Sequence, residues 1–545
     1  MNKPHQTRIK GNIVDVFSRK IYAGEILIQE GKIKEITPVD GQFSEYILPG
    51  FTDAHIHIES SMLVPYEFAR IALTHGTVST VSDPHEIANV CGLEGIDFMI
   101  ENARDAGLKI NFGAPSCVPA TGFETAGAVI DAAMTEKLLQ RNEIKYLSEM
   151  MNYPGVLFDD AEVLKKIAAA HKYGKPVDGH APGLRGEQAK KYISAGISTD
   201  HECFTLEEAL DKISFGMKII IREGSAAKNF EALHSLISSH PSVTMLCSDD
   251  KHPDDLLKGH INELVKRAFQ KGHQLFDVLQ CACVNPVLHY NLNTGLLRKG
   301  DAADFIVVDN LADFNVQQTW IDGICLAENG VSKLKPKEHN AINHFKSSPV
   351  QLDELKVKIT GEPIKIIEAL DGQLITRCIH DKPASKDNCW VSDISKDILK
   401  IVVVNRYRKV PPVTGFIKNF GFKSGAIAST VAHDSHNIIA VGVSDEDIVE
   451  SINTLMNYGG GLCVVNGKEK KSIALPVAGL MSTDSCHETG SAYSELDAMA
   501  KQLGSKLRAP FMTLSFMALL VIPHFKIGDK GLFDVDKFEL TTLNT

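Results

Sequence analysis

The chain has 545 residues, a formal net charge of −11 at pH 7 and 44% hydrophobic residues, a composition typical of globular proteins. The negative charge argues against a nucleic-acid partner, and the N-terminal residues lack the apolar stretch of a signal peptide. Eleven cysteines without disulfide-like spacing predict free thiols and a cytoplasmic location.

Short runs of alternating apolar and polar residues occupy positions 8–48, a pattern typical of a small antiparallel sheet. From Gly50 onward, apolar strands alternate with helical segments such as 64–73 and 160–171. The strand candidates end near His57, Asp83, Cys117, Glu149, His180, His201, Glu223 and Asp249. Their spacing of about 20 to 35 residues is typical of repeated βα units.

We therefore predict an α/β protein in which a (β/α)8 TIM-type barrel, residues 49–292, is inserted in a small β-sandwich. The sandwich is expected from residues 1–48 and 293–340, because the short β runs resume after the barrel. Residues 341–545 are predicted to form a C-terminal α/β domain. The apolar run 511–523 is too short to cross a bilayer and predicts a buried strand or helix, so we expect no membrane partner. A doubly wound sheet is the alternative to the barrel.

His55 and His57 form the first candidate metal site. In a strand, residues two positions apart point to the same face, so the two imidazoles leave the strand side by side. Ile56 and Ile58 then point the other way, into packing. A lone His-x-His motif is weak evidence, so the remaining strand ends must supply the other ligands.

Four further strand ends carry groups that bind metals or protons. Those expected to complete the site are Glu149, His180, His201 and Asp249. In a barrel, the carboxyl ends of the strands converge on one mouth, so these residues would meet His55 and His57 there. Four histidines and two carboxylates suit two divalent ions with Glu149 as the bridge. Such a pair lowers the pKa of a shared water to about 7.

At this point the chain resembles the amidohydrolase superfamily, through His-x-His, the single strand-end histidines, the strand-eight aspartate and the motif at 295–305. Longer motifs resemble the bacterial adenine deaminase family: FTDAHIHIESSM at 51–62, VSDPHEIANV at 81–90, SDDKHP at 248–253 and TVAHDSHN at 430–437. The resemblance covers nearly the whole chain. It implies hydrolysis of adenine to hypoxanthine and ammonia in purine salvage, with Mn²⁺ or Fe²⁺ as metal and Zn²⁺ as the alternative. Many superfamily members use a carboxylated lysine as the bridge, where this chain has Glu149.

Roles for the carboxylates follow from the chemistry of an amino-purine, which needs hydroxide at C6 and protons on a ring nitrogen and on the departing amine. Asp249 is expected to take and pass on the hydroxide proton. Asp250 points elsewhere and is expected to hydrogen-bond the N7 edge. Glu202 is either a proton carrier or a carboxylate that orients a metal-bound histidine.

Further substrate contacts are expected from the end of the second strand and from the seventh. Asp83, His85 and Glu86 support the metals or the substrate, with helix capping as the alternative. Glu223 and Ser225 are predicted to line the base pocket beside Arg222.

The polar loop 433–437 lies between two apolar runs of the C-terminal region. We expect this loop, with His433 and His436, to cover the barrel mouth as a lid, and the alternative is a solvated turn. Two competing functions remain: another amidohydrolase acting on a nucleobase or cyclic amide, and a non-catalytic metal-binding protein. The expected partner is adenine alone, in a homo-oligomer, most simply a dimer.

Overall fold

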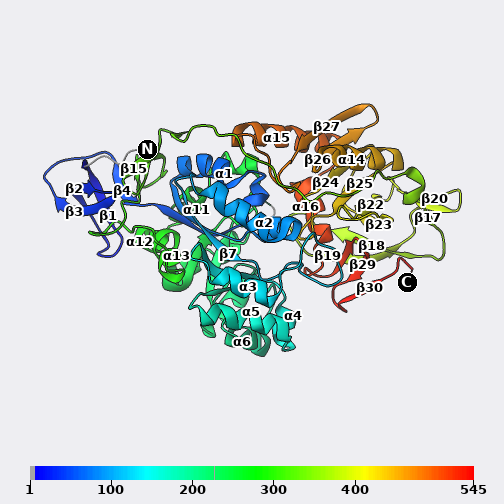
Figure 1. Cartoon of the computed structure of the whole chain (residues 1–545), viewed down its shortest axis with the longest axis horizontal. Coiled ribbons are helices and arrows are strands. Elements are labelled where there is room, and N and C mark those ends of the chain that lie inside the picture. The colour runs from blue at the N-terminus through cyan, green and yellow to red at the C-terminus, as the bar shows by residue number, and fades with distance from the viewer. Residues whose placement is uncertain (1–5, 226, 545) are drawn as a thin grey trace.

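The computed structural model describes residues 6–225 and 227–544. Three parts follow one another along its longest axis: an N-terminal sheet at one end, a central group of parallel strands and helices, and the C-terminal region at the other end (Figure 1). Within the described residues, no helix has both the length and the apolar character needed to span a membrane.

The sheet at the N-terminal end has eight strands in the order β16-β15-β14-β13-β4-β1-β2-β3. Its strands are β1 (Thr7–Asp15), β2 (Lys20–Gln29), β3 (Lys32–Pro38), β4 (Tyr46–Pro49), β13 (Phe305–Val308), β14 (Val316–Ile321), β15 (Ile324–Glu328) and β16 (Val331–Ser332). β4 is the junction, because it pairs in parallel with β1 and antiparallel with β13. Segments from before and after the central part therefore share one sheet.

The central part contains eight parallel strands, in one sheet of five and one of three. They are β5 (Phe51–Ile56), β6 (Thr77–Ser82), β7 (Lys109–Ala114), β8 (Ile144–Met150), β9 (Val177–Gly179), β10 (Thr199–Asp200), β11 (Lys218–Arg222) and β12 (Thr244–Cys247). Isolated parallel bridges, Val177 to Ile197 and Ile56 to Asp249, join the two sheets at both edges. Each predicted strand end lies within three residues of the end of one of these strands.

Helices separate the parallel strands, as the alternating pattern predicts. They are α1 (Pro65–Ala72), α2 (His85–Ala103), α3 (Ala132–Leu139), α4 (Tyr153–Leu157), α5 (Ala161–Lys172), α6 (Gly186–Ser194), α7 (Leu206–Ser214), α8 (Phe230–Leu233), α9 (Leu236–Ser239), α10 (Pro253–Leu256), α11 (Ile261–Gln270), α12 (Leu275–Leu279) and α13 (Asn285–His289). The side chain of Asp160 accepts from the first amides of α5, and Pro65 opens α1. The predicted α/β class is confirmed, and so are both named helices.

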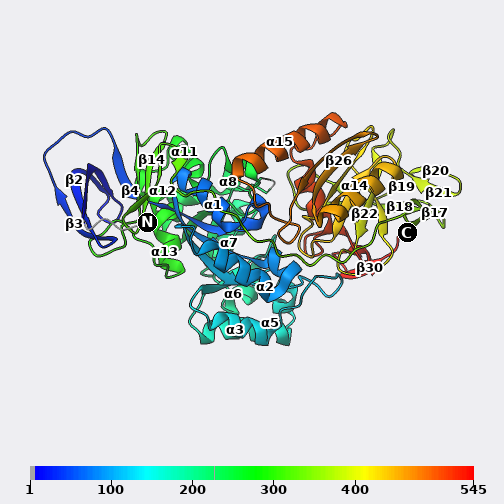
Figure 2. The same cartoon turned by 45° about the horizontal axis from the view of Figure 1, so that its top comes forward.

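The C-terminal region is built on a second eight-stranded sheet, in the order β19-β18-β23-β22-β25-β24-β26-β27. Its strands are β18 (Ile364–Ala369), β19 (Thr376–Asp381), β22 (Ile398–Val404), β23 (Val413–Lys418), β24 (Ala426–Ser429), β25 (Ile438–Gly442), β26 (Gly461–Asn466) and β27 (Glu469–Ala474). Two small sheets contain β17 (Val357–Lys358), β20 (Ala384–Lys386), β21 (Cys389–Val391), β28 (Phe525–Gly528), β29 (Gly531–Asp534) and β30 (Glu539–Thr541). The helix α14 (Asp445–Tyr458) packs against β24 and β26 (Figure 2).

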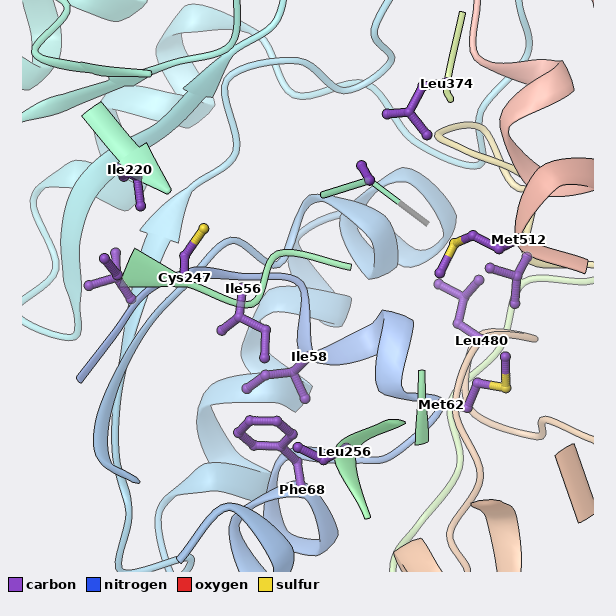
Figure 3. Packing of buried hydrophobic residues seen from close by; sticks show 14 of the residues in the cluster. Ile56, Ile58, Met62, Phe68, Ile220, Cys247, Leu256, Leu374, Leu480 and Met512 are labelled. Atoms are coloured by element: carbon purple, nitrogen blue, oxygen red, sulfur yellow. The ribbon is translucent and has the colours of Figure 1, made fainter. Parts of the chain in front are cut away.

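Two further helices, α15 (Cys486–Gln502) and α16 (Pro510–Ser515), come from the C-terminal region, and a short helix η6 (Phe516–Ala518) continues α16. The apolar run 511–523 is thus buried and begins as helix, which the sequence allowed. One continuous core joins the central part to the C-terminal region. Figure 3 shows Ile56 and Ile58 within this core and Met62 beside Leu480, and the amide of Ser482 donates to the Met62 carbonyl at 2.7 Å.

Candidate active site

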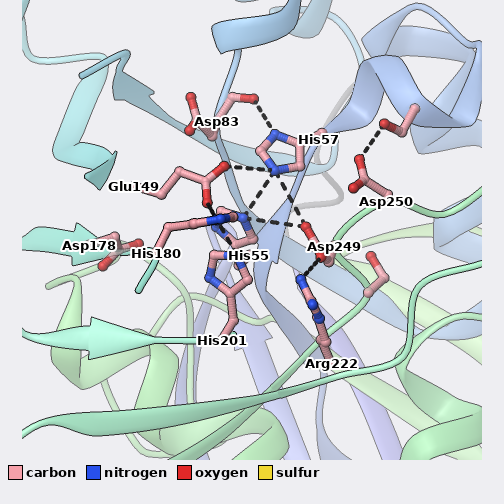
Figure 4. Close-up of polar contacts among 12 residues, drawn as sticks. His55, His57, Asp83, Glu149, Asp178, His180, His201, Arg222, Asp249 and Asp250 are labelled. Atoms are coloured by element: carbon pink, nitrogen blue, oxygen red, sulfur yellow. Dashed lines mark hydrogen bonds and ion pairs between the residues drawn. The ribbon is translucent and has the colours of Figure 1, made fainter. Parts of the chain in front are cut away.

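His55 and His57 bring two imidazoles together at the end of β5. Their Nε2 atoms lie 3.1 Å apart, and both side chains are buried (Figure 4). Burial lowers the pKa of His55 well below its usual value, so this ring is neutral and has a lone pair to offer. Two ring nitrogens facing each other at this distance are well placed to bind a common cation.

Glu149, at the end of β8, lies at the centre of the site. One carboxylate oxygen is 3.3 Å from Nε2 of His57, and the other is 2.8 Å from Nδ1 of His180 and 3.2 Å from Nε2 of His201. Burial raises the pKa of Glu149, but the three surrounding histidines outweigh it and hold that pKa well below its usual value. We call these four residues the Glu149 cluster. Its carboxylate reaches both sides of the site, as a bridge requires.

Asp249 follows β12 and faces the same histidines. Its Oδ1 is 3.4 Å from Nε2 of His57 and 3.6 Å from Nε2 of His55. The residue adopts φ = 55°, a left-handed conformation that costs about 1–3 kcal/mol for a side chain of this kind. The amide of Asp249 donates to the His55 carbonyl at 3.0 Å, which holds this conformation in place. The strained backbone of Asp249 at the carboxyl ends of the parallel strands indicates a functional position.

Arg222 lies in the site, as the sequence predicted, but sequence reasoning missed the carboxylates that it contacts. Its guanidinium is buried and donates to Oδ2 of Asp249 at 2.8 Å and to both oxygens of Glu202, one of them at 2.8 Å. Burial raises the pKa of Asp249, but His57 and Arg222 together lower it well below its usual range. Arg222 therefore helps to keep Asp249 ionised and fixes the positions of both carboxylates. The position of Arg222 at the end of the seventh strand was the sequence signal that could have revealed these contacts.

The polar groups of the second strand end surround His85. Nδ1 of His85 is 3.1 Å from Oδ2 of Asp83 and 3.6 Å from Oε1 of Glu149. Asp83 also accepts from the backbone amide of His85, as an N-terminal helix residue does. Asp83 thus contacts both the side chain of His85 and the first amide of α2.

Asp250 turns away from its neighbour Asp249 and accepts a hydrogen bond from Oγ of Ser60 at 2.6 Å. Burial and the charge of Asp249 raise the pKa of Asp250 to about 6. The adjacent acids therefore differ: the neighbours of Asp249 hold it ionised, whereas Asp250 binds a proton more readily than an ordinary aspartate does.

Glu223 and Ser225 lie away from the residues described above. This corrects the prediction that they line the base pocket. Oε1 of Glu223 is 2.8 Å from Arg267 on α11, and Oγ of Ser225 donates to Asp255 at 2.8 Å. Successive residues along an extended chain point in opposite directions, so Arg222 faces the site and Glu223 does not.

The loop 433–437 is buried throughout, so the solvated-turn alternative is wrong. Nδ1 of His433 is 2.7 Å from Oε1 of Glu86, and Nε2 of His436 is 2.5 Å from Oε2 of the same carboxylate. We call these three residues the Glu86 cluster. It connects the N-terminal end of α2 to the C-terminal region directly beside the Glu149 cluster.

One cavity collects most of these side chains and adds three apolar ones from the C-terminal region, which sequence reasoning missed. It is lined by His57, His85, Glu86, Glu149, Met151, His180, His201, Glu202, Arg222, Asp249, Asp250, Leu374, His433, Asp434, Phe516 and Leu519. We call Leu374, Phe516 and Leu519 the roof. A polar floor at the strand ends and an apolar roof are typical of sites for small planar molecules.

The residues at the strand ends fit a divalent metal. Several groups place three or more ligand atoms within 4.8 Å of one another, among them His55, His57 and Asp249, and His55, Glu149 and His201. Nδ1 of His55 and Nε2 of His180 are buried and have no hydrogen-bond partner within the described part of the chain. Imidazole and carboxylate ligands suit Mn²⁺, Fe²⁺ and Zn²⁺ alike.

Comparison with known proteins agrees with this geometry. The amidohydrolase family model matches residues 46–325, and the model for the adenine deaminase C-terminal domain matches residues 373–539. The adenine deaminase of Methanosarcina acetivorans is 52% identical over 544 residues, covering 98% of each chain. This chain belongs to the adenine deaminase family.

Other members of the adenine deaminase family are similarly close. The adenine deaminase of Sulfurovum sp. is 52% identical over 97% of this chain and 98% of its own. That of Parabacteroides distasonis is 46% identical over the full length of both chains. The family match thus extends over the strand ends, the Glu86 cluster and the roof.

Proposed function

We propose that this protein hydrolyses adenine to hypoxanthine and ammonia. The observation that supports this most strongly is full-length similarity to adenine deaminases in a chain that retains the whole set of strand-end ligands. The roof supports it as well, because an apolar surface opposite polar strand ends suits a flat heterocycle with polar edges.

For the fold we propose a (β/α)8 barrel in residues 49–292, inserted in a small β-sandwich formed by residues 1–48 and 293–340, with 341–545 as a C-terminal α/β domain. The parallel bridges at both edges of the central sheets support closure into a barrel. The pairing of β4 with β13 supports the insertion.

Two divalent ions, Mn²⁺ or Fe²⁺ with Zn²⁺ as the alternative, would be held by His55, His57, Glu149, His180, His201 and Asp249. When bound, such ions lower the pKa of a coordinated water to about 7 and so supply a nucleophile at neutral pH. The assignment is supported by the contact of the His55 and His57 rings and by the central position of Glu149.

The chain's own acids would move the protons. Asp249, held ionised by His57 and Arg222, would accept a proton from water and pass it to the purine. Asp250 would meet the N7 edge, where its raised pKa lets it donate as a carboxylic acid. The bidentate bond from Arg222 to Glu202 favours the orienting role of that carboxylate over the role of proton carrier.

Asp83 and His85 would support the bridging carboxylate, since His85 lies between Asp83 and Glu149. The Glu86 cluster would close the cavity over the bound base, because His433 and Asp434 from the C-terminal region line the same cavity as the strand-end residues. Exclusion of water strengthens every charged contact inside the cavity.

Ammonia release from Mn²⁺-loaded protein tests this function, with adenine, adenosine, cytosine and dihydroorotate offered separately. We expect rapid release from adenine alone. Turnover of cytosine or dihydroorotate without turnover of adenine would instead support another nucleobase or cyclic-amide hydrolase. Retained metal with no turnover of any substrate would support a non-catalytic protein.

A further inference from the structure

The roof is assembled from two segments of the C-terminal region that are far apart in the sequence. Leu374 lies in the connection between β18 and β19, whereas Phe516 begins η6, and both side chains are 3% exposed. The ring of Phe516 stacks on the imidazole of His433 with centroids 4.4 Å apart and planes at 17°. The roof therefore contacts the Glu86 cluster, and its position depends on how the two segments are held together.

Lys526 of β28 joins these two segments. Its ammonium nitrogen donates to the carbonyl of Leu374 at 2.7 Å and to the carbonyl of Phe516 at 3.0 Å, and its side chain is completely buried. Thr376 and Phe525 reinforce the same junction through the 2.8 Å bond from Oγ1 of Thr376 to the Phe525 carbonyl. A single side chain thus fixes the backbone of two roof residues.

Lys526 is a buried lysine that bonds to backbone carbonyls, as Lys166 does, and not to a carboxylate. No carboxylate of the described residues lies within ion-pair distance of it, whereas buried Lys400 meets Asp445 at 2.8 Å and buried Lys212 meets Glu208 at 2.7 Å. Burial lowers the pKa of Lys526 to about 7. A neutral amine has two N–H donors, which matches the two carbonyls it meets. Burying this group is unfavourable in itself, so its presence requires a benefit elsewhere.

We propose that Lys526 is a positioning residue for the active site, which holds Leu374 and Phe516 in place as the apolar surface against which the bound base lies. This inference rests on the proposed function, because the roof meets a planar base only if such a base is the substrate. Lys526 itself contacts neither the cavity nor the strand-end ligands; it acts through the two carbonyls.

Three variants test the inference. Lys526→Met keeps the length of the side chain and removes its donors, and Lys526→Arg keeps donors. Lys400→Met is the matched control, since Lys400 is equally buried in β22 and bonds to Asp445 and the Leu355 carbonyl away from the cavity. Metal content, KM and kcat for adenine, and amide hydrogen exchange are measured for each variant and for the wild type.

We expect Lys526→Met to bind metal normally and to raise KM for adenine about tenfold with kcat little changed, because a roof contact binds substrate and transition state alike. Amide exchange should accelerate in 370–376 and 514–520 and stay unchanged at the strand ends of the central part. Lys526→Arg should restore most of the affinity. Lys400→Met should leave both KM and exchange of the roof segments as in the wild type.

A normal KM and unchanged exchange of the roof segments in Lys526→Met would overturn the inference, and so would equal changes in the Lys400→Met control. If Lys526→Met fails to fold, Lys526→Gln, which is shorter and keeps an amide NH2 group as donor, replaces it with the same readouts. Failure of the wild type to deaminate adenine would instead refute the proposed function. In that case the exchange measurement alone still decides whether Lys526 holds the roof.

Discussion

Two buried glutamates with histidine partners lie side by side in this protein, and they differ in how the histidines are arranged. In the Glu149 cluster three imidazoles share one carboxylate, and His57 also faces His55 at 3.1 Å. In the Glu86 cluster each carboxylate oxygen has its own imidazole, at 2.7 and 2.5 Å, and the two rings are 5.7 Å apart.

The histidine partners of the two glutamates respond to nearby carboxylates in the same way. Burial lowers the pKa of His433, but Glu86 outweighs it and raises that pKa to about 9, so the pair neutralises itself. Burial likewise lowers the pKa of His57, but Asp249 and Glu149 outweigh it and raise that pKa well above its usual value, whereas burial and its histidine neighbours keep the pKa of His55 low. The two clusters therefore differ in geometry: a shared carboxylate with His55 facing it through His57 suits a cation site, whereas a matched ion pair links two parts of the chain.

The largest effect is expected from Glu149→Gln, which preserves the shape of the bridge and removes its charge. The histidines around it would lose the anion that two cations need between them. We expect loss of bound metal by atomic absorption and loss of detectable ammonia release. Two metal equivalents per chain with normal turnover in this variant would show that Glu149 is not the bridge.

Next in size is Asp249→Asn, which removes the proposed base. We expect turnover to fall on the order of 10²- to 10⁴-fold, the range for loss of general acid–base catalysis. Asp250→Asn should keep the metal content near that of the wild type and lower kcat/KM less, through the contact to N7. Equal metal loss in both variants would refute this division between the two acids.

Glu86→Gln breaks the ion pairs with His433 and His436 and should leave the metal in place. Removing one partner of a buried pair destabilises by about 3–5 kcal/mol, so we expect a lower free energy of unfolding in urea. Turnover should fall about tenfold as the C-terminal loop loses its contact with the cavity. Metal loss comparable to that of Glu149→Gln would mean that the Glu86 cluster is itself a metal site.

The pH dependence of stability follows from His433, whose pKa rises from 6.5 to about 9 on folding. A raised pKa means that the folded protein binds this proton more tightly than the unfolded chain does. The stabilisation is complete below pH 6.5 and is lost as the pH rises through about 9, by about 3 kcal/mol at most. Urea unfolding of wild type and His433→Gln between pH 6 and 10 measures this, and the variant should lack the decline.

The smallest effect is expected from Glu223→Gln, because this carboxylate pairs with Arg267 away from the cavity. Loss of a partly exposed ion pair costs about 1 kcal/mol or less. We expect unchanged metal content and kcat/KM within about twofold of the wild type. A large fall in kcat/KM would instead support the original prediction that Glu223 lines the base pocket.

Much of the site could be predicted because it depends on local geometry. The two-residue period of a strand places His55 and His57 on one face, and convergence of parallel strand ends brings Glu149, His180 and Asp249 to them. Periodicity and flanking turns likewise predict the two halves of the eight-stranded sheet at the N-terminal end and the helices at 65–72 and 161–172. The cation in the site and the purine specificity remain predictions.

The sequence by itself thus determined the strand ends, their polar residues and the family resemblance, because each is encoded within a few neighbouring positions. The strand period places Arg222 and Glu223 on opposite faces, but only the tertiary structure decided that Arg222 faces the site while Glu223 meets Arg267. It alone placed Phe516 in the roof and Lys526 behind it. Contacts between segments so distant in the chain depend on how whole domains pack, and no local pattern of residues records that packing.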